Sequence, residues 1–115
     1  MDKRIKQTFL ILEECAKNQK QIYYQKLYEQ IGLDRENPDD RNRGAHILAE
    51  VNKISINKNK TMLSSLVTLK VANKPADGFF EFAIELGRIS PDIDENKKEK
   101  FWISEVKRIF KVYNK

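Results

Sequence analysis

A chain of 115 residues suits one domain, and we expect residues 1–115 to fold as a single unit. Its net charge of +5 favours an anionic partner such as nucleic acid, although a charge of this size can also serve solubility alone. One cysteine, Cys15, and one histidine, His46, exclude an internal disulfide and a cysteine-rich zinc site. No apolar run approaches the roughly 18 residues that span a bilayer. We therefore expect a cytoplasmic protein that has no membrane segment, no metal and no cofactor.

The first predicted element is a helix over residues 2–17, where apolar side chains recur at helical spacing and Asp2 is suited to cap the first turn. A short, β-prone stub follows at residues 21–23. The second helix covers about residues 24–31. It is predicted to end at Gly32, because glycine readily adopts the left-handed backbone that follows many helices.

The third helix is predicted from Arg41 to about residue 56, because apolar residues recur along one face of this segment. Pro38 suits the entry to a helix, and Asp39 or Asp40 can cap its N-terminus. Residues 57–60 are polar and predict a turn.

The second half of the chain predicts one strand and two helices. Residues 63–71 are rich in β-prone side chains and predict the strand. Residues 79–86 predict a short, largely buried helix that ends at Gly87. Residues 96–113 predict a last helix with one broad apolar face.

The last helix is also the most basic part of the chain. Its basic residues, which face only Glu99 and Glu105, are Lys97, Lys98, Lys100, Lys107, Arg108, Lys111 and Lys115. This charge either forms a binding surface or only keeps the protein soluble. The aromatic residues of the same helix are expected to complete the core, which makes a membrane-surface role less favoured.

The order of these elements predicts the fold class. Two helices followed by a strand, with basic residues at the start of the second of these helices, is the order of a winged helix-turn-helix. We therefore predict a mostly α domain with a minimal β-sheet, winged-helix-turn-helix-like, with the last helix packed across the core.

The start of the third helix holds the first candidate binding residues. In a helix-turn-helix this part of the second helix meets base edges in the major groove. Arginine and asparagine can make bidentate contacts to guanine and adenine, so Arg41, Asn42 and Arg43 are candidates for base contacts. His46 lies about one turn further on and is a candidate for a phosphate contact.

Lysines near the end of the third helix are candidates for contacts to backbone phosphates, which supply affinity but no sequence information. These residues are Lys53, Lys58 and Lys60. The alternative for all of these candidates is that they are solvated or paired side chains that do not contact nucleic acid. Asp39 and Asp40 repel phosphate, Arg43 can pair with Asp39, and exposed lysines are often merely solvated.

The chain offers little for catalysis. It has no glycine-rich phosphate loop, and no arrangement of Ser, His and acid is evident. Glu81 and Glu85 lie one turn apart on a predicted helix, but this spacing does not imply paired catalysis. Cys15 is expected to be a buried structural thiol. We predict a protein that is not an enzyme.

Several short motifs resemble a group of small standalone bacterial and phage proteins of unassigned function. The motifs include Ile22-Tyr23-Tyr24-x-x-Leu27, Asp40-Arg-Asn-Arg43, Met62-Leu63-Ser64-x-Leu66-Val67, Pro75-x-x-Gly78-Phe-Phe80 and Phe101-Trp102-x-x-Glu105. The resemblance covers most of the chain from Ile22 onward and implies no activity.

A more distant resemblance is functional. An aromatic-led helix, a helix that opens near Arg43-Gly44, an apolar strand and the turn Gly78-Phe79 are similar to the DNA-binding domain of the O6-alkylguanine DNA alkyltransferases. The aromatic residue is Tyr24 here. The reactive Pro-Cys-His-Arg stretch of that family is absent, and Ser64 and Ser65 occupy the strand instead. Because alkyl transfer requires a thiolate, the resemblance implies a winged-helix DNA-binding shape without that activity.

The leading functional prediction is non-enzymatic binding of nucleic acid, with double-stranded DNA favoured. The alternative is a small phage or mobile-element protein-interaction module that inhibits or adapts a host factor, such as a defence nuclease. The protein is expected to be a monomer or a homodimer, with Trp102 or Phe110 at the interface in the second case.

Overall fold

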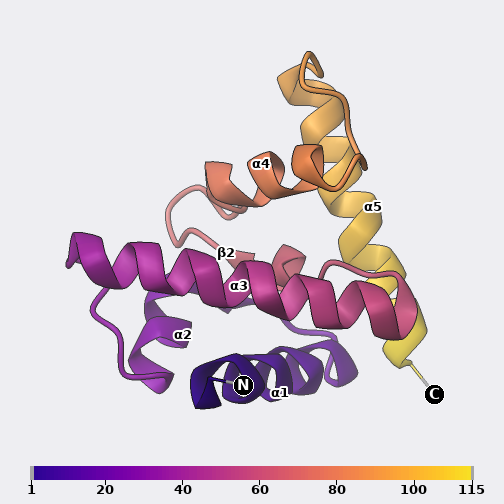
Figure 1. The fold of residues 1–115 in the computed structure, drawn as a ribbon. Coiled ribbons are helices and arrows are strands. Elements are labelled where there is room, and N and C mark those ends of the chain that lie inside the picture. Colours follow the sequence, from indigo (N-terminus) through magenta and orange to yellow (C-terminus); the bar gives the residue numbers. More distant parts are fainter. Residues whose placement is uncertain (1, 115) are drawn as a thin grey trace.

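Helices surround one buried, irregular segment in the computed structural model, which describes residues 2–114 (Figure 1). The α-helices of this part of the chain are α1 (Lys3–Lys17), α2 (Tyr24–Gln30), α3 (Pro38–Asn59), α4 (Asp77–Glu85) and α5 (Glu95–Tyr113). A 3-10 helix, η1 (Leu63–Leu66), and the strands β1 (Ile22–Tyr23) and β2 (Val67–Thr68) complete it. The domain is therefore mostly helical with a minimal sheet, as predicted. Lys115 of the predicted basic set lies outside the described residues.

The centre of the core is the segment of residues 61–68, in which every residue is buried. Met62, Leu63 and Leu66 have no exposed surface. The 3-10 helix η1 contacts α1, α3 and α5, so the three longest helices pack around it. Met62, Leu63, Leu66 and Val67 of this segment belong to the hydrophobic core of the domain.

The buried segment has almost no regular partners for its backbone, so side chains from the surrounding helices supply hydrogen bonds. The Met62 amide donates to Glu105 Oε2 at 2.7 Å, and the Ser65 carbonyl accepts from Trp102 Nε1 at 2.8 Å. Glu105 is 4% exposed and also accepts from Arg88 at 3.0 Å and Arg108 at 3.2 Å. Two arginines thus compensate the buried carboxylate, which a buried charge requires.

The sheet consists of two residues in each strand. β1 and β2 pair in parallel, with Ile22 opposite Val67 and Tyr23 opposite Thr68. Parallel neighbours need a long crossover, and here α2 and α3 supply it. The sheet therefore anchors the start of α2 against the end of the buried segment.

The strand predicted at residues 63–71 is wrong for most of its length. Residues 63–66 form η1, and only Val67 and Thr68 are extended in a ladder. The Ser65 hydroxyl donates to the Met62 carbonyl at 2.6 Å, a local bond that favours a tight turn over an extended strand. Leu66 and Val67 are buried, Leu69 is partly buried and Val71 is 97% exposed.

The third helix is longer than predicted at both ends. It begins at Pro38, and its cap is Asn37, whose side chain accepts from the amides of Asp39 at 2.9 Å and Asp40 at 3.2 Å. Neither aspartate is the cap. The predicted turn at residues 57–60 is also wrong, because α3 continues to Asn59 and ends at Lys60 in the left-handed conformation.

The bounds of α1, α2, α4 and α5 agree with the sequence prediction to within two residues, and Asp2 caps α1 as expected. The predicted burial of α4 is wrong in part. Phe79 and Ala83 are buried, but Leu86 is 37% exposed because α4 lies at the edge of the domain. Within residues 2–114, no helix has the length and apolar character needed to cross a membrane.

The role of Glu105 gives a testable prediction. Replacement Glu105→Gln should lower the free energy of unfolding by about 2 to 3 kcal/mol, because it weakens charge-assisted hydrogen bonds to a buried amide and two arginines. Urea denaturation measures the change. The control Glu99→Gln, an exposed position on the same helix, should leave the unfolding midpoint unchanged. Equal midpoints for Glu105→Gln and wild type would contradict this role.

Candidate nucleic-acid interface

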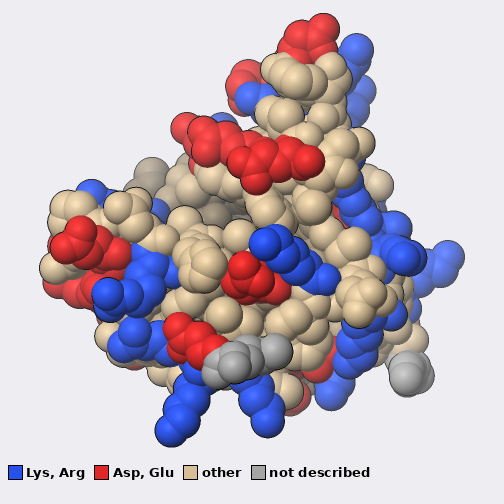
Figure 2. Space-filling model, viewed as in Figure 1, with Lys and Arg blue, Asp and Glu red and all other residues tan. Residues whose placement is uncertain are grey.

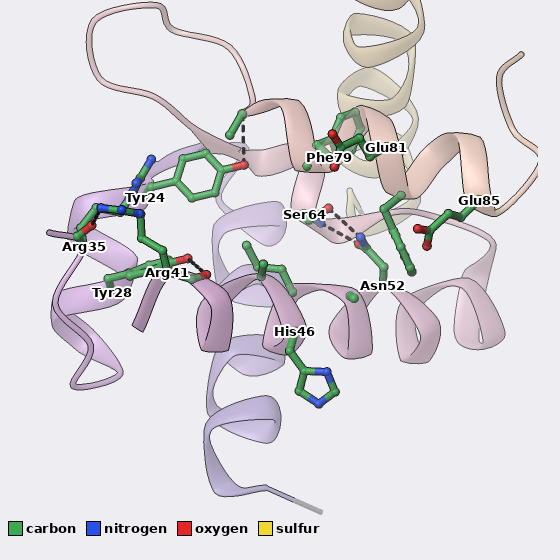
Figure 3. A pocket seen from close by; sticks show the side chains of 16 residues that line it. Tyr24, Tyr28, Arg35, Arg41, His46, Asn52, Ser64, Phe79, Glu81 and Glu85 are labelled. Atoms are coloured by element: carbon green, nitrogen blue, oxygen red, sulfur yellow. Dashed lines mark hydrogen bonds between the residues drawn. The ribbon is translucent and has the colours of Figure 1, made fainter. Parts of the chain in front are cut away.

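A cavity of about 450 Å³ lies between α3 and α4, and the tyrosines of α2 stand at one end of it (Figure 3). Its apolar walls include Leu48 of α3 and Phe79 and Phe82 of α4. The volume falls within the range of about 300 to 1,000 Å³ that small-molecule pockets have. The cavity is therefore large enough for a ring-sized ligand.

Two buried polar side chains line the inner part of the cavity. Asn52 of α3 is 2% exposed and Ser64 of η1 is 3% exposed. Asn52 Nδ2 donates to Ser64 Oγ at 2.7 Å, and the Ser64 amide donates to Asn52 Oδ1 at 3.0 Å. A serine hydroxyl has one donor hydrogen and an asparagine side-chain amide has two. The Ser64 hydroxyl can therefore donate one further hydrogen bond, and the Asn52 amide can also donate one more. Each side chain thus keeps one donor hydrogen that is not used between Asn52 and Ser64.

The α2 end of the cavity is cationic and aromatic. The guanidinium of Arg35 lies 5.2 Å from the ring centroid of Tyr24 and 5.8 Å from that of Tyr28. Burial raises the pKa of Tyr24 to about 12, and its hydroxyl oxygen accepts from the Ala76 amide at 3.2 Å. Arg41 donates to the Arg35 carbonyl at 3.1 Å, which holds the loop of residues 31–37 next to the start of α3.

The α4 rim of the cavity is acidic. Glu81 and Glu85 line the cavity and are exposed, and Figure 2 shows acidic side chains in a row on this helix. Figure 3 shows Arg35 and Glu85 at opposite ends of the site. The cavity thus has a positive end and a negative end, so a ligand with an anionic part must enter with that part toward Arg35 and Arg41.

The structure brings only part of the predicted site together. Arg41 and His46 line the cavity, with the imidazole of His46 directed away from α4 (Figure 3). Asn42 is exposed on α3 next to Arg41 but does not line the cavity. Lys60 lies at the far end of α3, about 28 Å along the helix axis from Arg41 at the usual rise per residue. Seven residues spread over such a length do not form one compact site.

Three of the predicted residues have carboxylate partners. Arg43 lies 3.6 Å from Asp40, Lys53 lies 3.2 Å from Glu50, and Lys58 lies 2.8 Å from Glu13. Arg43 therefore pairs with Asp40, not with Asp39. These pairs reduce the positive potential along α3, which favours the solvated alternative for Arg43, Lys53 and Lys58.

The sequence prediction did not select several residues that line the cavity. Arg35, Tyr28 and Asn52 were not candidates, since a loop arginine, a helical tyrosine and a helical asparagine carry no distinctive local signal. Of the residues named for the distant resemblance, Tyr24, Ser64, Gly78 and Phe79 line the cavity, whereas Arg43, Gly44 and Ser65 do not.

Comparison of the chain with models of protein families, with curated proteins and with solved structures gave no match. Among residues 2–114, no group of three or more His, Cys, Asp or Glu side chains is placed to hold a metal ion.

The contact between α2 and α3 gives a second prediction. A Cβ atom at Gly44 would lie 2.1 Å from the Tyr28 hydroxyl oxygen, so no larger residue fits without movement of a buried ring. Gly44→Ala should destabilise the protein by about 1 to 3 kcal/mol despite the better helix propensity of alanine. The control Gly78→Ala, where nothing lies within 4 Å, should be neutral or stabilising in thermal denaturation. Equal melting temperatures for Gly44→Ala and wild type would show that Tyr28 moves freely.

The pair of Lys58 and Glu13 gives a prediction on pH. Burial alone would raise the pKa of Glu13, but hydrogen bonds from Lys58 at 2.8 Å and Tyr113 at 2.6 Å lower it below its ordinary value of 4.5. A lowered carboxyl pKa stabilises the folded state above 4.5, and this contribution is lost as pH falls through the folded-state value. Glu13→Gln should therefore cost about 1 kcal/mol at pH 7.

Denaturation of wild type and Glu13→Gln across pH 3 to 7 measures this contribution. The difference in stability should shrink as pH falls below 4.5. The exposed carboxylate control, Glu29→Gln on α2, should differ little from wild type at any pH. A difference for Glu13→Gln that stays constant with pH would contradict a role for the ionised carboxylate.

Proposed function

We propose that the protein binds double-stranded DNA through α2 and α3, used as a helix-turn-helix, and holds one unstacked base in the cavity between α3 and α4. One observation carries the proposal. A cavity with aromatic walls and two buried hydrogen-bonding side chains opens beside Arg35 and Arg41. The role is binding without catalysis.

The arrangement of α2 and α3 supports contact with a duplex. The loop of residues 31–37 joins the two helices, and the first turns of α3 expose Arg41, Asn42 and Arg43. Asp39 and Asp40 occupy the same end of α3 and repel phosphate. Arg41 and Asn42 are therefore better placed to contact base edges. Arg35 is better placed to contact a backbone phosphate.

The cavity supports the accommodation of a base. Proteins that take a base out of the stack read its polar edge by hydrogen bonds and hold its face against aromatic or apolar side chains. Phe79 and Phe82 offer apolar surface, and Asn52 and Ser64 offer donors for a polar edge. Glu81 and Glu85 repel phosphate on the other side, so the duplex lies toward Arg35.

The distant resemblance to the alkyltransferase DNA-binding domain supports the same function. Ser64 lies in the cavity wall, but its hydroxyl oxygen accepts a hydrogen bond from the Asn52 amide, and no imidazole or carboxylate within residues 2–114 bonds to it. A serine without a base is a weak nucleophile. A nucleobase in the cavity would thus be bound, and no group would be transferred to Ser64.

A protein partner is the second candidate function, and the ion pairs favour it. Arg43 and Lys53 are engaged with carboxylates, and the acidic α4 rim fits a basic protein surface better than DNA. Copurification of one host protein that survives nuclease treatment would support this function.

Duplex DNA with a central 2-aminopurine tests the proposed DNA function. Binding should increase the fluorescence of the analogue, because unstacking relieves its quenching. Ala45→Leu places a larger side chain at the exposed wall of the cavity and should abolish the increase while duplex binding persists. Arg35→Ala should weaken binding and reduce the salt slope by about 0.9, the value for one lost phosphate contact.

The control Ala72→Leu lies in an exposed loop outside the cavity and should behave as wild type. Absence of duplex binding at low salt would overturn the DNA function. Binding without any change in fluorescence would overturn the base in the cavity alone.

A further inference from the structure

The basic residues of α5 fall into a regular row. Lys97, Lys100, Lys107 and Lys111 are exposed and, with the exposed Ser104, follow steps of three and four residues. These steps keep all five side chains on one face of a helix. We name the four lysines the α5 lysine row.

The row is free of compensating charge. The ion pairs of α5 join Lys98 to Glu95 and both Arg88 and Arg108 to Glu105, and within residues 2–114 no lysine of the row takes part in an ion pair. This contrasts with α3, where basic residues have carboxylate partners. Figure 2 shows Lys and Arg gathered along the right edge of the molecule, over α5.

The opposite face of α5 is committed to the core. Trp102, Val106 and Ile109 are buried there. The exposed Ile103 and Val112 lie nine residues apart on opposite sides of the helix, so α5 has no continuous apolar face with which to enter a membrane. The row itself contains only lysines and one serine. Its chemistry therefore fits a partner with a repeating negative charge that stays in water.

We propose that the α5 lysine row is a second nucleic-acid surface, which binds the phosphate backbone of duplex DNA without reading its sequence. The row spans about 21 Å at the usual helical rise. Duplex DNA carries about 12 backbone charges over the same length. Lysine is a flexible point charge that suits contact with such a backbone without fixed geometry.

The row is separate from the cavity. No residue of α5 lines the cavity, and Figure 1 shows α5 at the edge of the domain, away from the start of α3. One chain can therefore contact two stretches of duplex at once. The identity of this ligand rests on the proposed DNA function, but the surface does not depend on the residues of α2 and α3.

A bridging experiment tests the proposal. One biotinylated duplex is fixed to beads, and a labelled duplex of unrelated sequence is added with the protein at low salt. Wild-type protein should capture the labelled duplex. Lys100→Ala/Lys107→Ala should still bind the fixed duplex but reduce capture to the level of beads without protein. The logarithm of the duplex binding constant falls linearly with the logarithm of the salt concentration. For this variant the magnitude of that slope should be smaller by about 1.8, because two phosphate contacts are lost.

Lys17→Ala/Lys20→Ala removes the same charge at exposed positions outside the row and should capture as wild type does. If wild type binds the fixed duplex without capture, and the row variant keeps the wild-type slope, the second surface is overturned and the DNA function stands. Equal losses in the two double variants would also overturn it, since net charge alone would then explain the effect.

Two further outcomes separate this inference from the proposed function. Loss of all duplex binding in the row variant, with Arg35→Ala and Ala45→Leu unchanged from wild type, would establish the row and overturn the α2–α3 site. Absence of any duplex binding by wild type would overturn both. Binding to anionic lipid vesicles that is lost in the row variant, with duplex binding unchanged, would assign the row to a membrane and overturn the inference.

Discussion

The buried segment of residues 61–68 is the constraint on which the rest of the structure depends. It is apolar enough to form the centre of the core, but only two of its residues join a sheet. Asn52 of α3 and Glu105 and Trp102 of α5 supply hydrogen bonds to its backbone instead. Because each unpaired buried polar group costs free energy, these bonds fix both helices relative to the segment.

The same network supports the candidate site. Asn52 bonds both the amide and the hydroxyl of Ser64, so one side chain stabilises the core and orients a donor at the cavity wall. Tyr28 has a similar double role, since its ring packs against Gly44 of α3 and also lies under Arg35. The cavity is consequently preorganised, and a ligand would not need to order these groups on binding.

The sequence predicts local structure here far better than contacts between distant segments. Periodicity identifies α1, α2, α5 and the middle of α3, and a run of apolar residues that ends at Gly87 identifies α4. β-propensity mispredicts residues 63–66. The local bond from Ser65 to Met62 favours the turn, and the partners that satisfy the backbone of this segment, Asn52 and Glu105, lie 12 and 43 residues away from Ser64 and Met62. The sequence likewise favours Lys58 as a phosphate ligand, because it gives no sign of the partner Glu13, which lies 45 residues away.

The net charge of the chain likewise does not show where on the surface the charged side chains lie. Carboxylates lie beside the basic residues of α3 and along α4, whereas the α5 lysine row takes part in no ion pair within residues 2–114. In the proposed function, the α5 lysine row and the cavity would contribute differently to binding. A single-sign row supplies affinity that depends on salt and not on sequence. A cavity with a positive end, a negative end and two fixed donors supplies discrimination, because a wrong ligand leaves Asn52 or Ser64 without a partner. Affinity and selectivity would then respond independently to substitutions on α5 and around the cavity.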